Sequence, residues 1–359
     1  MRNIAVLCNY VLDPNRVGGM DYFYWAFDAS CREKGYSVTW FFPNRATHGQ
    51  YTTLNIISAE HTRIEDCFIQ HVKQGSTSYD YVICHFLELC TSFYRDLRSL
   101  TKAKIIAVDH NPRPLGGYTW RKKLRKRING IRYGKYTDIY VAVSEYTRNE
   151  LIRDFGKGVA GKIKVIYNGI DVARIKTRKH RNTQNPSFLV ACHLRESKGI
   201  QDLIDAVNGL AEDIKAEVRI DVYGDGPYRS SLEKKIVEYH LQNQIHFKGS
   251  TDKLTEIYST YDYLIHPTHM ECFSLGLLES LAANVPVITT PVGGNEEAVK
   301  NGINGFIFPA KDSYALTSLI GKVYKGEMRI VSDVDPMIRT TFTIQNMVSG
   351  HMQLLHSCI

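Results

Sequence analysis

Short apolar runs alternate with amphipathic segments along the whole chain. In the first half these runs have the length and continuity of buried strands, and they lie at residues 4–7, 38–42, 81–83, 105–108 and 139–143. A helix is expected over residues 21–34, and helical patterns lie between the later runs. Continuous apolar strands separated by helices are typical of a parallel sheet covered on both faces.

The same alternation restarts after residues 173–186, which are polar, basic and aperiodic and therefore predict a linker. Strands are expected at residues 187–191, 218–223, 245–247, 263–266 and 285–289. Helices are expected over residues 200–210 and 275–283, and a last one over 342–355. The pattern predicts an α/β protein with two Rossmann-like domains, residues 1–172 and 187–340, followed by a C-terminal segment, residues 341–359.

The composition is that of a globular protein and excludes several other classes. Apolar residues make up 43% of the chain and charged residues 23%, which argues against disorder or a coiled coil as the main state. No run approaches the ~18 apolar residues that span a membrane, and the apolar start is too short for a signal-peptide core. The eight cysteines form no CxxC pair and lie mostly in apolar runs. We therefore expect reduced, buried cysteines in a cytoplasmic protein.

The net charge of +8 is concentrated in one segment. Nine basic residues and no acidic one lie between His110 and Thr137, whereas the rest of the chain is close to neutral. Three apolar residues at helical spacing run through this segment, namely Leu124, Ile128 and Ile131. The expected patch comprises Trp120, Arg121, Lys122, Lys123, Arg125, Lys126 and Arg127.

A basic helix with aromatic anchors suits an anionic membrane surface or a lipid pyrophosphate. A solvated charged helix and a nucleic-acid surface are the alternatives for this patch. We expect the membrane surface and no nucleic acid as partner, because nucleic-acid binding would leave the carboxylates and glycine turns described next without a role.

The densest candidate chemistry lies after the expected strand that ends at His266. A loop containing Glu271 leads to Ser274, a suitable N-cap for a helix in which Glu279 lies about one and a half turns from the start. Amides at such a helix start bind phosphate oxygens, and carboxylates accept hydrogen bonds from vicinal hydroxyls. Complementarity to the helix dipole alone is the alternative explanation for two glutamates here.

The run Glu271 to Glu279 resembles the E-x7-E motif of retaining GT-B glycosyltransferases of family 4. Further marks of that family occur in the same order along nearly the whole chain. They are Gly18-Gly19, Val143-Ser144, Asn168-Gly169-Ile170-Asp171, Cys192-His193-Leu194 with Lys198-Gly199, Tyr223-Gly224-Asp225-Gly226-Pro227, Phe247-Lys248-Gly249, Pro267, Pro286, Gly293-Gly294 with Glu297, and Asn304-Gly305.

The resemblance implies a GT-B fold, with the two parallel sheets facing each other across a cleft and the last helix crossing back to the N-terminal domain. It implies that Glu279 holds the ribose of a nucleotide-sugar and that Glu271 faces the donor sugar near C3. Lys198 would neutralise the diphosphate as it departs. The backbone amides that would cradle that diphosphate belong to Phe273, Ser274, Leu275 and Gly19. In the glycine-rich turns, Gly18 and Gly224 would allow close approach of the backbone.

One family position departs from the pattern. The family has an arginine where this chain has His193, and a neutral imidazole is a weaker phosphate ligand than a guanidinium group. Either His193 is protonated beside the diphosphate, or Arg195 takes over. In the N-terminal half, His110 follows an expected strand and resembles the family histidine that contacts the donor sugar or phosphate. Ligands of parallel α/β sheets bind at that end of the strands.

These inferences predict a retaining hexosyltransferase that uses a UDP-, dTDP- or GDP-sugar and no cofactor or metal. The single Asp-x-Asp sequence, Asp333-Val334-Asp335, lies far from any expected strand end. The expected acceptor is a glycan or lipid-linked glycan of bacterial capsule, O-antigen or exopolysaccharide, at the cytoplasmic face of the plasma membrane. A non-hydrolysing nucleotide-sugar epimerase and a non-catalytic nucleotide-sugar-binding protein of the same fold are the alternatives.

Overall fold

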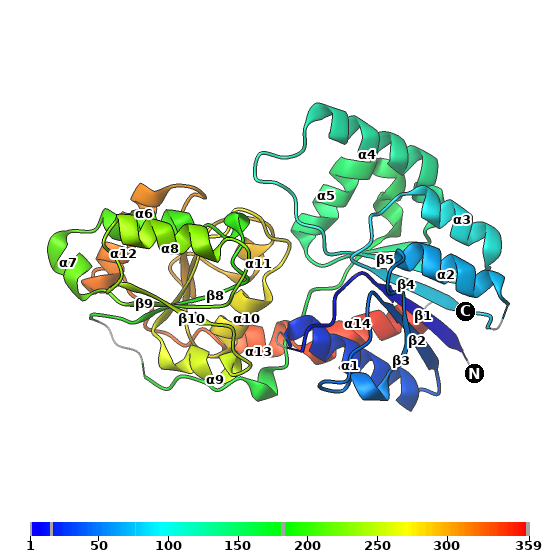
Figure 1. Cartoon of the computed structure of the whole chain (residues 1–359), viewed down its shortest axis with the longest axis horizontal. Helices are drawn as coiled ribbons and strands as arrows, with labels where there is room; N and C mark the ends of the chain where they lie inside the picture. The colour runs from blue at the N-terminus through cyan, green and yellow to red at the C-terminus, as the bar shows by residue number, and fades with distance from the viewer. Residues whose placement is uncertain (1, 15–16, 76, 181–183, 357–359) are drawn as a thin grey trace. The chain divides into compact units, whose positions relative to one another are not determined.

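The computed structural model describes residues 2–14, 17–75, 77–180 and 184–356. The chain forms two compact units, each with a parallel sheet and flanking helices (Figure 1). The first unit runs to Pro112, includes Gly116–Gly169 and takes up the chain again from Ile344. The second unit comprises Arg113–Leu115 and Ile170–Thr343.

The first unit has a seven-stranded parallel sheet in the order β3-β2-β1-β4-β5-β6-β7. Its strands are β1 (Asn3–Cys8), β2 (Ser37–Phe42), β3 (Asn55–Ser58), β4 (Tyr81–His85), β5 (Lys104–Asp109), β6 (Ile139–Ala142) and β7 (Ile163–Val165). All five expected strands form, with ends shifted by at most two residues. The sequence pattern missed β3 and β7, because these short edge strands have few fully buried residues.

Helices cover both faces of this sheet. They are α1 (Gly19–Glu33), α2 (Ile64–Lys73), α3 (Ser92–Leu100), α4 (Trp120–Tyr133), α5 (Glu145–Phe155) and α14 (Ile344–His356). Phe68 of α2, Tyr94 of α3 and Leu151 of α5 belong to one buried cluster with alternate residues of the strands. On the other face α1 packs against Trp40 and Phe42 of β2, and α14 lies beside α1 (Figure 1).

The second unit has a six-stranded parallel sheet in the order β10-β9-β8-β11-β12-β13. Its strands are β8 (Phe188–Ala191), β9 (Ile220–Tyr223), β10 (Ile245–Gly249), β11 (Tyr263–His266), β12 (Val287–Thr289) and β13 (Gly305–Ile307). The sequence pattern missed β13, a three-residue edge strand. The prediction of an α/β fold with two Rossmann-like units is confirmed.

The helices of the second unit are mostly short. They are α6 (Ile200–Asn208), α7 (Glu212–Glu217), α8 (Arg229–Glu238), α9 (Leu254–Ile257), α10 (Leu275–Ala282), α11 (Asn295–Ala298), α12 (Ser313–Tyr324) and α13 (Pro336–Thr341). The polar segment 173–186 contacts this unit through Arg178, whose guanidinium lies 2.6 Å from the carboxylate of Asp262. Asp262 is fully buried and directly precedes β11, so the ion pair holds Arg178 at the start of that strand.

Candidate functional site

The start of α10 collects the two glutamates of the predicted motif. Strand β11 ends at His266, a loop carries Glu271, and α10 begins at Leu275 with Glu279 on its second turn. Ser274 occupies the N-cap position as expected, but its side chain makes no capping hydrogen bond to the first-turn amides. The prediction of Ser274 as N-cap residue is therefore confirmed, although its extended backbone leaves the hydroxyl without a hydrogen bond to a first-turn amide.

Glu271 forms an ion pair with Lys198, one of the residues predicted to face the donor. The Lys198 Nζ lies 2.6 Å from Glu271 Oε2, and both side chains are about four-fifths buried. His266 Nε2 lies 3.6 Å from the same carboxylate oxygen. Burial is the largest single influence and would raise the pKa of Glu271, but the charges of and hydrogen bonds from Lys198 and His266 together outweigh it and lower that pKa to about 2. The carboxylate is therefore ionised at neutral pH.

Glu279 has a different electrostatic environment although it follows Glu271 by only eight residues. Burial raises the pKa of its carboxyl to about 7, and the hydrogen bond from the Tyr258 hydroxyl, at 3.1 Å, opposes that rise. Sequence reasoning missed Tyr258, because it lies in the 3-10 turn Tyr258–Thr260, well outside any motif. The two glutamates thus differ in charge near pH 7, with one permanently ionised and one poised to take up a proton.

Glycine turns bring the backbone close around these side chains. Gly224 has φ of +126°, and a Cβ there would lie 1.9 Å from the carbonyl oxygen of Cys192. Gly293 has φ of +66°, and a Cβ there would lie 2.3 Å from the carbonyl oxygen of Glu271. Any other residue at either position would displace the backbone that carries the candidate site.

The turn after β8 carries the two residues proposed to replace the family arginine. His193 is partly exposed, and its carbonyl accepts a hydrogen bond from the Arg195 amide at 2.9 Å. Arg195 is exposed, and the next turn, Glu196–Lys198, ends in the Lys198 that pairs with Glu271. Both residues thus lie near the ion pair along the chain, and their roles remain a prediction.

In the first unit, His110 follows β5 directly, is partly buried and contacts the buried His85. His110 Nε2 lies 3.0 Å from Nδ1 of His85, the last residue of β4. The ring of Phe86 stacks on His110 at 4.3 Å between centroids. Burial lowers the pKa of His110 to about 3 and lowers the pKa of His85 as well, so both imidazoles are neutral at pH 7.

Gly18 and Gly19 open α1, as their place in the sequence suggests. A Cβ on Gly18 would meet only an oxygen of Asp21, at 4.0 Å, so no backbone approach inside this unit requires glycine there. The Gly18 amide donates to that Asp21 carboxylate at 2.9 Å, and Tyr51 donates to the other carboxylate oxygen. Asp21 is fully buried and fixes the turn at the start of the helix.

The basic segment forms α4, with most of its charged residues exposed. Trp120, Leu124, Ile128 and Ile131 are between 51% and 76% exposed, so the apolar side of the helix faces solvent. The opposite side packs through Gly130, where a Cβ would lie 2.1 Å from the Phe155 carbonyl oxygen. Lys126 differs from the rest of the predicted patch, because its amine lies 3.1 Å from Asp154 and is largely buried.

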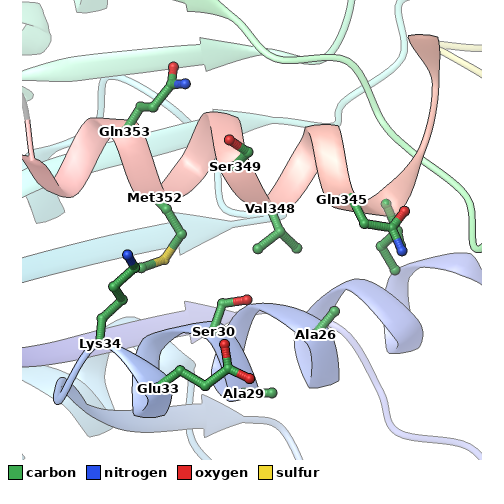
Figure 2. A pocket seen from close by; sticks show the side chains of 11 residues that line it. Ala26, Ala29, Ser30, Glu33, Lys34, Gln345, Val348, Ser349, Met352 and Gln353 are labelled. Atoms are coloured by element: carbon green, nitrogen blue, oxygen red, sulfur yellow. The ribbon is translucent and has the colours of Figure 1, made fainter. Parts of the chain in front are cut away.

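A separate hollow of about 590 Å³ lies between α1 and α14 in the first unit. Figure 2 shows Val348 and Met352 pointing from α14 toward α1, and Ser30 pointing from α1 toward α14. The residues around it are mostly small or apolar, and the predicted site residues are absent from its lining. It is therefore a groove of the helix pair and separate from the residues described above.

Within the described part of the chain, no group of three or more histidine, cysteine, aspartate or glutamate side chains is arranged to hold a metal ion. Asp333 accepts a hydrogen bond from Asn284, and Asp335 pairs with Arg339. Among the helices of the described ranges, none is both long and apolar enough to cross a bilayer.

Two family descriptions match consecutive parts of the chain. Residues 17–174 match Glycosyltransferase Family 4, and residues 171–333 match Glycosyl transferases group 1. The curated relatives include N-acetyl-alpha-D-glucosaminyl L-malate synthase of Bacillus anthracis, 25% identical over 55% of this chain and 54% of that protein. They also include a glycogen synthase of Mycobacterium tuberculosis, 28% identical over 58% of this chain and 53% of that protein. The chain thus spans about half the length of the curated relatives it matches.

Solved structures share the fold over the full chain. Anabaena HepE in complex with UDP-glucose matches with a TM-score of 0.77 and 18% identity, over 99% of this chain and 100% of that one. Sucrose-phosphate synthase from Thermosynechococcus elongatus matches with a TM-score of 0.78 and 16% identity, over 99% of both chains. The two family matches together cover residues 17–333 and support glycosyltransferase domains in both units, and the solved structures share the GT-B fold.

Proposed function

We propose that the protein transfers a hexosyl group from a nucleoside diphosphate sugar to an acceptor hydroxyl, with retention of configuration. The observation that carries the proposal is the pairing of Lys198 with Glu271 beside the start of α10. The Lys198 ammonium and the amides at the start of α10 are groups that bind a diphosphate. The Glu271 carboxylate beside them can accept hydrogen bonds from sugar hydroxyls.

In this proposal the carboxylate of Glu279 accepts hydrogen bonds from the ribose hydroxyls, and Glu271 orients the donor sugar near C3. The amides of Phe273, Ser274 and Leu275 hold the diphosphate, and the Gly19 amide is a further proposed contact. The bond between the sugar and the diphosphate breaks, and the electron pair leaves with the diphosphate. Lys198 stabilises that growing charge. The acceptor hydroxyl attacks the same face, and its proton passes to the leaving group.

The donor is proposed to be a UDP-, dTDP- or GDP-sugar, and UDP-sugars are the first choice. The relative HepE is described in complex with UDP-glucose, which supports this order. We propose that transfer needs no metal, because Lys198 and the helix amides supply the positive charge at the diphosphate. Full activity in excess EDTA is the expected result, and loss of activity that added Mg²⁺ restores would contradict it.

The direct test is calorimetric titration with UDP, UDP-sugars, dTDP-sugars and GDP-sugars, on the wild-type protein and on Glu279→Ala. Binding of one nucleotide class that is lost in the variant is the expected result. A matched control is Glu238→Ala, an exposed glutamate at the end of α8 in the same unit. Equal affinity in wild type and Glu279→Ala would contradict the ribose role, and binding without sugar transfer to any acceptor hydroxyl would favour a non-catalytic binding protein. Sugar interconversion without an acceptor would favour the epimerase alternative.

We further propose that α4 binds an anionic membrane surface at the cytoplasmic face of the plasma membrane, where a lipid-linked or growing surface glycan is the acceptor. The exposed apolar side of a strongly basic helix supports this placement.

Flotation with phosphatidylglycerol vesicles at low salt tests the placement of α4. The triple variant Trp120→Ser, Leu124→Ser and Ile128→Ser should lose binding. The control carries the same serine substitutions at three comparably exposed apolar residues of the second unit, Val237, Ile303 and Val331. This control should still bind the vesicles. No flotation of the wild-type protein would rule the membrane role out.

A further inference from the structure

His85 and His110 form a hydrogen-bonded imidazole pair at adjacent strand ends of the first unit. Their rings lie 5.3 Å apart between centroids, with planes inclined by 27°. Strands β4 and β5 are neighbours in register, with His85 opposite Val108, so the residue that ends β4 reaches the one that follows β5. The pair therefore results from strand pairing between residues 25 positions apart.

Phe86 holds the same ring from a strained backbone position. Its φ of +60° lies in the left-handed region, which aromatic residues rarely adopt. Its ring lies nearly parallel to the His110 imidazole, at an angle of 15°. Strain of this kind persists only where the surrounding structure enforces it. Two consecutive residues at the end of β4 thus orient His110, one by a hydrogen bond and one by stacking.

His85 itself cannot rotate freely. It is 2% exposed and packs between Phe23 and Tyr24 of α1 and His351 of α14. His351 donates from Nδ1 to the Met347 carbonyl at 2.9 Å, because a carbonyl can only accept. The elements packed around His85 therefore present aromatic rings and neutral imidazoles, with Asp109 as the charged neighbour of His110.

A neutral imidazole carries a hydrogen on one nitrogen only. Which of the two histidines donates the hydrogen bond therefore decides whether Nδ1 of His110 is a hydrogen-bond donor or an acceptor. If His85 donates, His110 keeps its hydrogen on Nδ1 and is a donor there. If His110 donates from Nε2, its Nδ1 can only accept.

We propose that His85 is a positioning residue that donates from Nδ1 to His110 Nε2 and so fixes His110 as an Nδ1–H donor. The acceptor on the ligand is an oxygen of the donor sugar or its diphosphate, and a phosphate oxygen can only accept. The choice of this tautomer and the identity of that oxygen rest on the proposed function, whereas the contact between His85 and His110 does not. In this proposal His85 does not contact the ligand. Its role is to keep the hydrogen of His110 on Nδ1.

The tautomer is measured on the whole protein by nitrogen-15 NMR of labelled histidines, with His110→Gln identifying the His110 signals. The expected result is a hydrogen on Nδ1 of both His85 and His110 in the wild-type protein. In His85→Phe, which keeps a ring but offers no donor, His110 should become a mixture of tautomers. A hydrogen on Nε2 of His110 in the wild-type protein overturns the proposal, whatever the enzyme activity.

Kinetics provide the second measurement. His85→Phe should lower kcat about 10- to 100-fold with little change in the donor KM, as for other residues that orient a ligand-binding histidine. His85→Asn should restore most of the rate, because its amide N–H lies near the place of Nδ1. The control is His71→Phe, which removes a 3.0 Å bond to Tyr79 in the same unit and should change kcat less than twofold.

The melting temperatures of the His85 variants show whether a loss of kcat comes from a misplaced His110 or from a less stable fold. Equal losses of kcat in His85→Phe and His85→Asn at an unchanged melting temperature overturn the proposal. If no variant and no wild-type sample transfers sugar, the proposed function fails, and the NMR result still decides the tautomer. If His85→Phe does not fold, the wild-type tautomer and the His85→Asn rate decide.

Discussion

The two units share a strand order, yet they place different chemistry at the same point of the sheet. In each unit the fourth strand lies beside the first and ends in a histidine, which is His85 in β4 and His266 in β11. His85 is bonded to the neutral imidazole of His110, whereas His266 lies 3.6 Å from the ionised Glu271. Burial lowers the pKa of both strand-end histidines.

The difference arises in the loops and not in the sheets. The loop after β11 brings a carboxylate, and the turn after β8 brings Lys198 to meet it. The first residues after β4 are the apolar Phe86 and Leu87, and the acid that follows them, Glu88, is exposed and lies 3.8 Å from Arg125. Helix α14 adds His351 and apolar side chains. The fold supplies the position, and the loop residues decide whether that position carries charge or only neutral hydrogen bonds.

Removing Lys198, the cation paired with Glu271, should have the largest effect on activity, and it tests whether charge is essential at the site of the second unit. Lys198→Ala should lower kcat at least ~100-fold, because one preorganised charge at a developing anion contributes on that scale. The variant also leaves Glu271 buried without its cation, so the pKa of Glu271 should rise from about 2, which carboxyl NMR can measure.

Lys235→Ala is the matched control for Lys198→Ala. Lys235 forms an ion pair of the same 2.6 Å length with Asp205 in the same unit, at a more exposed place. Equal losses of activity in the two variants would show that Lys198 acts through stability alone.

The second prediction uses the carboxyl that titrates near neutrality. Because the pKa of Glu279 is raised to about 7, this group binds a proton below pH 7 and is ionised above it. If the ionised form holds the ribose, nucleotide affinity should fall about tenfold per pH unit below pH 7. Glu279→Gln should bind weakly and without this pH dependence, as followed by titration between pH 5.5 and 8.5. A wild-type affinity that does not change below pH 7 would remove Glu279 from the ribose site.

The third prediction concerns the neutral histidines His85, His110 and His351 of the first unit, and it has the smallest expected effect. Burial lowers the pKa of His351 to about 4, below the ~6.5 expected in an unfolded chain. The unfolded chain therefore takes up the proton first, and stability is lost as the pH falls from about 6.5 to about 4. This one residue, 2% exposed, should cost on the order of 2 kcal/mol at pH 5, which lowers the melting temperature by roughly 4–8 °C.

His351→Phe keeps the aromatic contacts with Phe23 and Phe27 but cannot take up a proton. The melting temperature of this variant should fall less between pH 7.5 and pH 5 than that of the wild type. His71→Phe, on α2, is the comparison, because the pKa of His71 is lowered at a far less buried position and should matter less. Identical pH dependence in wild type and His351→Phe would show that other groups govern acid stability.

The sequence predicted the strands that are long and buried, because three or more consecutive apolar residues suffice to mark a central parallel strand. It missed the short edge strands β3, β7 and β13, of which β3 and β7 also bury little. The motif order was also predictable, and with it the places of Glu271, Glu279 and His110. The N-cap position of Ser274 was predictable as well, but whether its hydroxyl caps the helix was not, because that depends on a hydroxyl rotamer that the residue type does not fix.

By itself the sequence determined the alternating elements, the basic segment and the residue types near the strand ends, because these depend on local pattern. Only the tertiary structure decided which of those residues meet. Lys198 pairs with Glu271 across 73 positions, and Tyr258 bonds to Glu279 across 21. Tertiary packing also left Leu124 and Ile128 exposed, because the contact of Gly130 with the Phe155 backbone turns the other side of α4 inward. Such contacts depend on strand order and helix packing, which bring distant residues together and which no local pattern encodes.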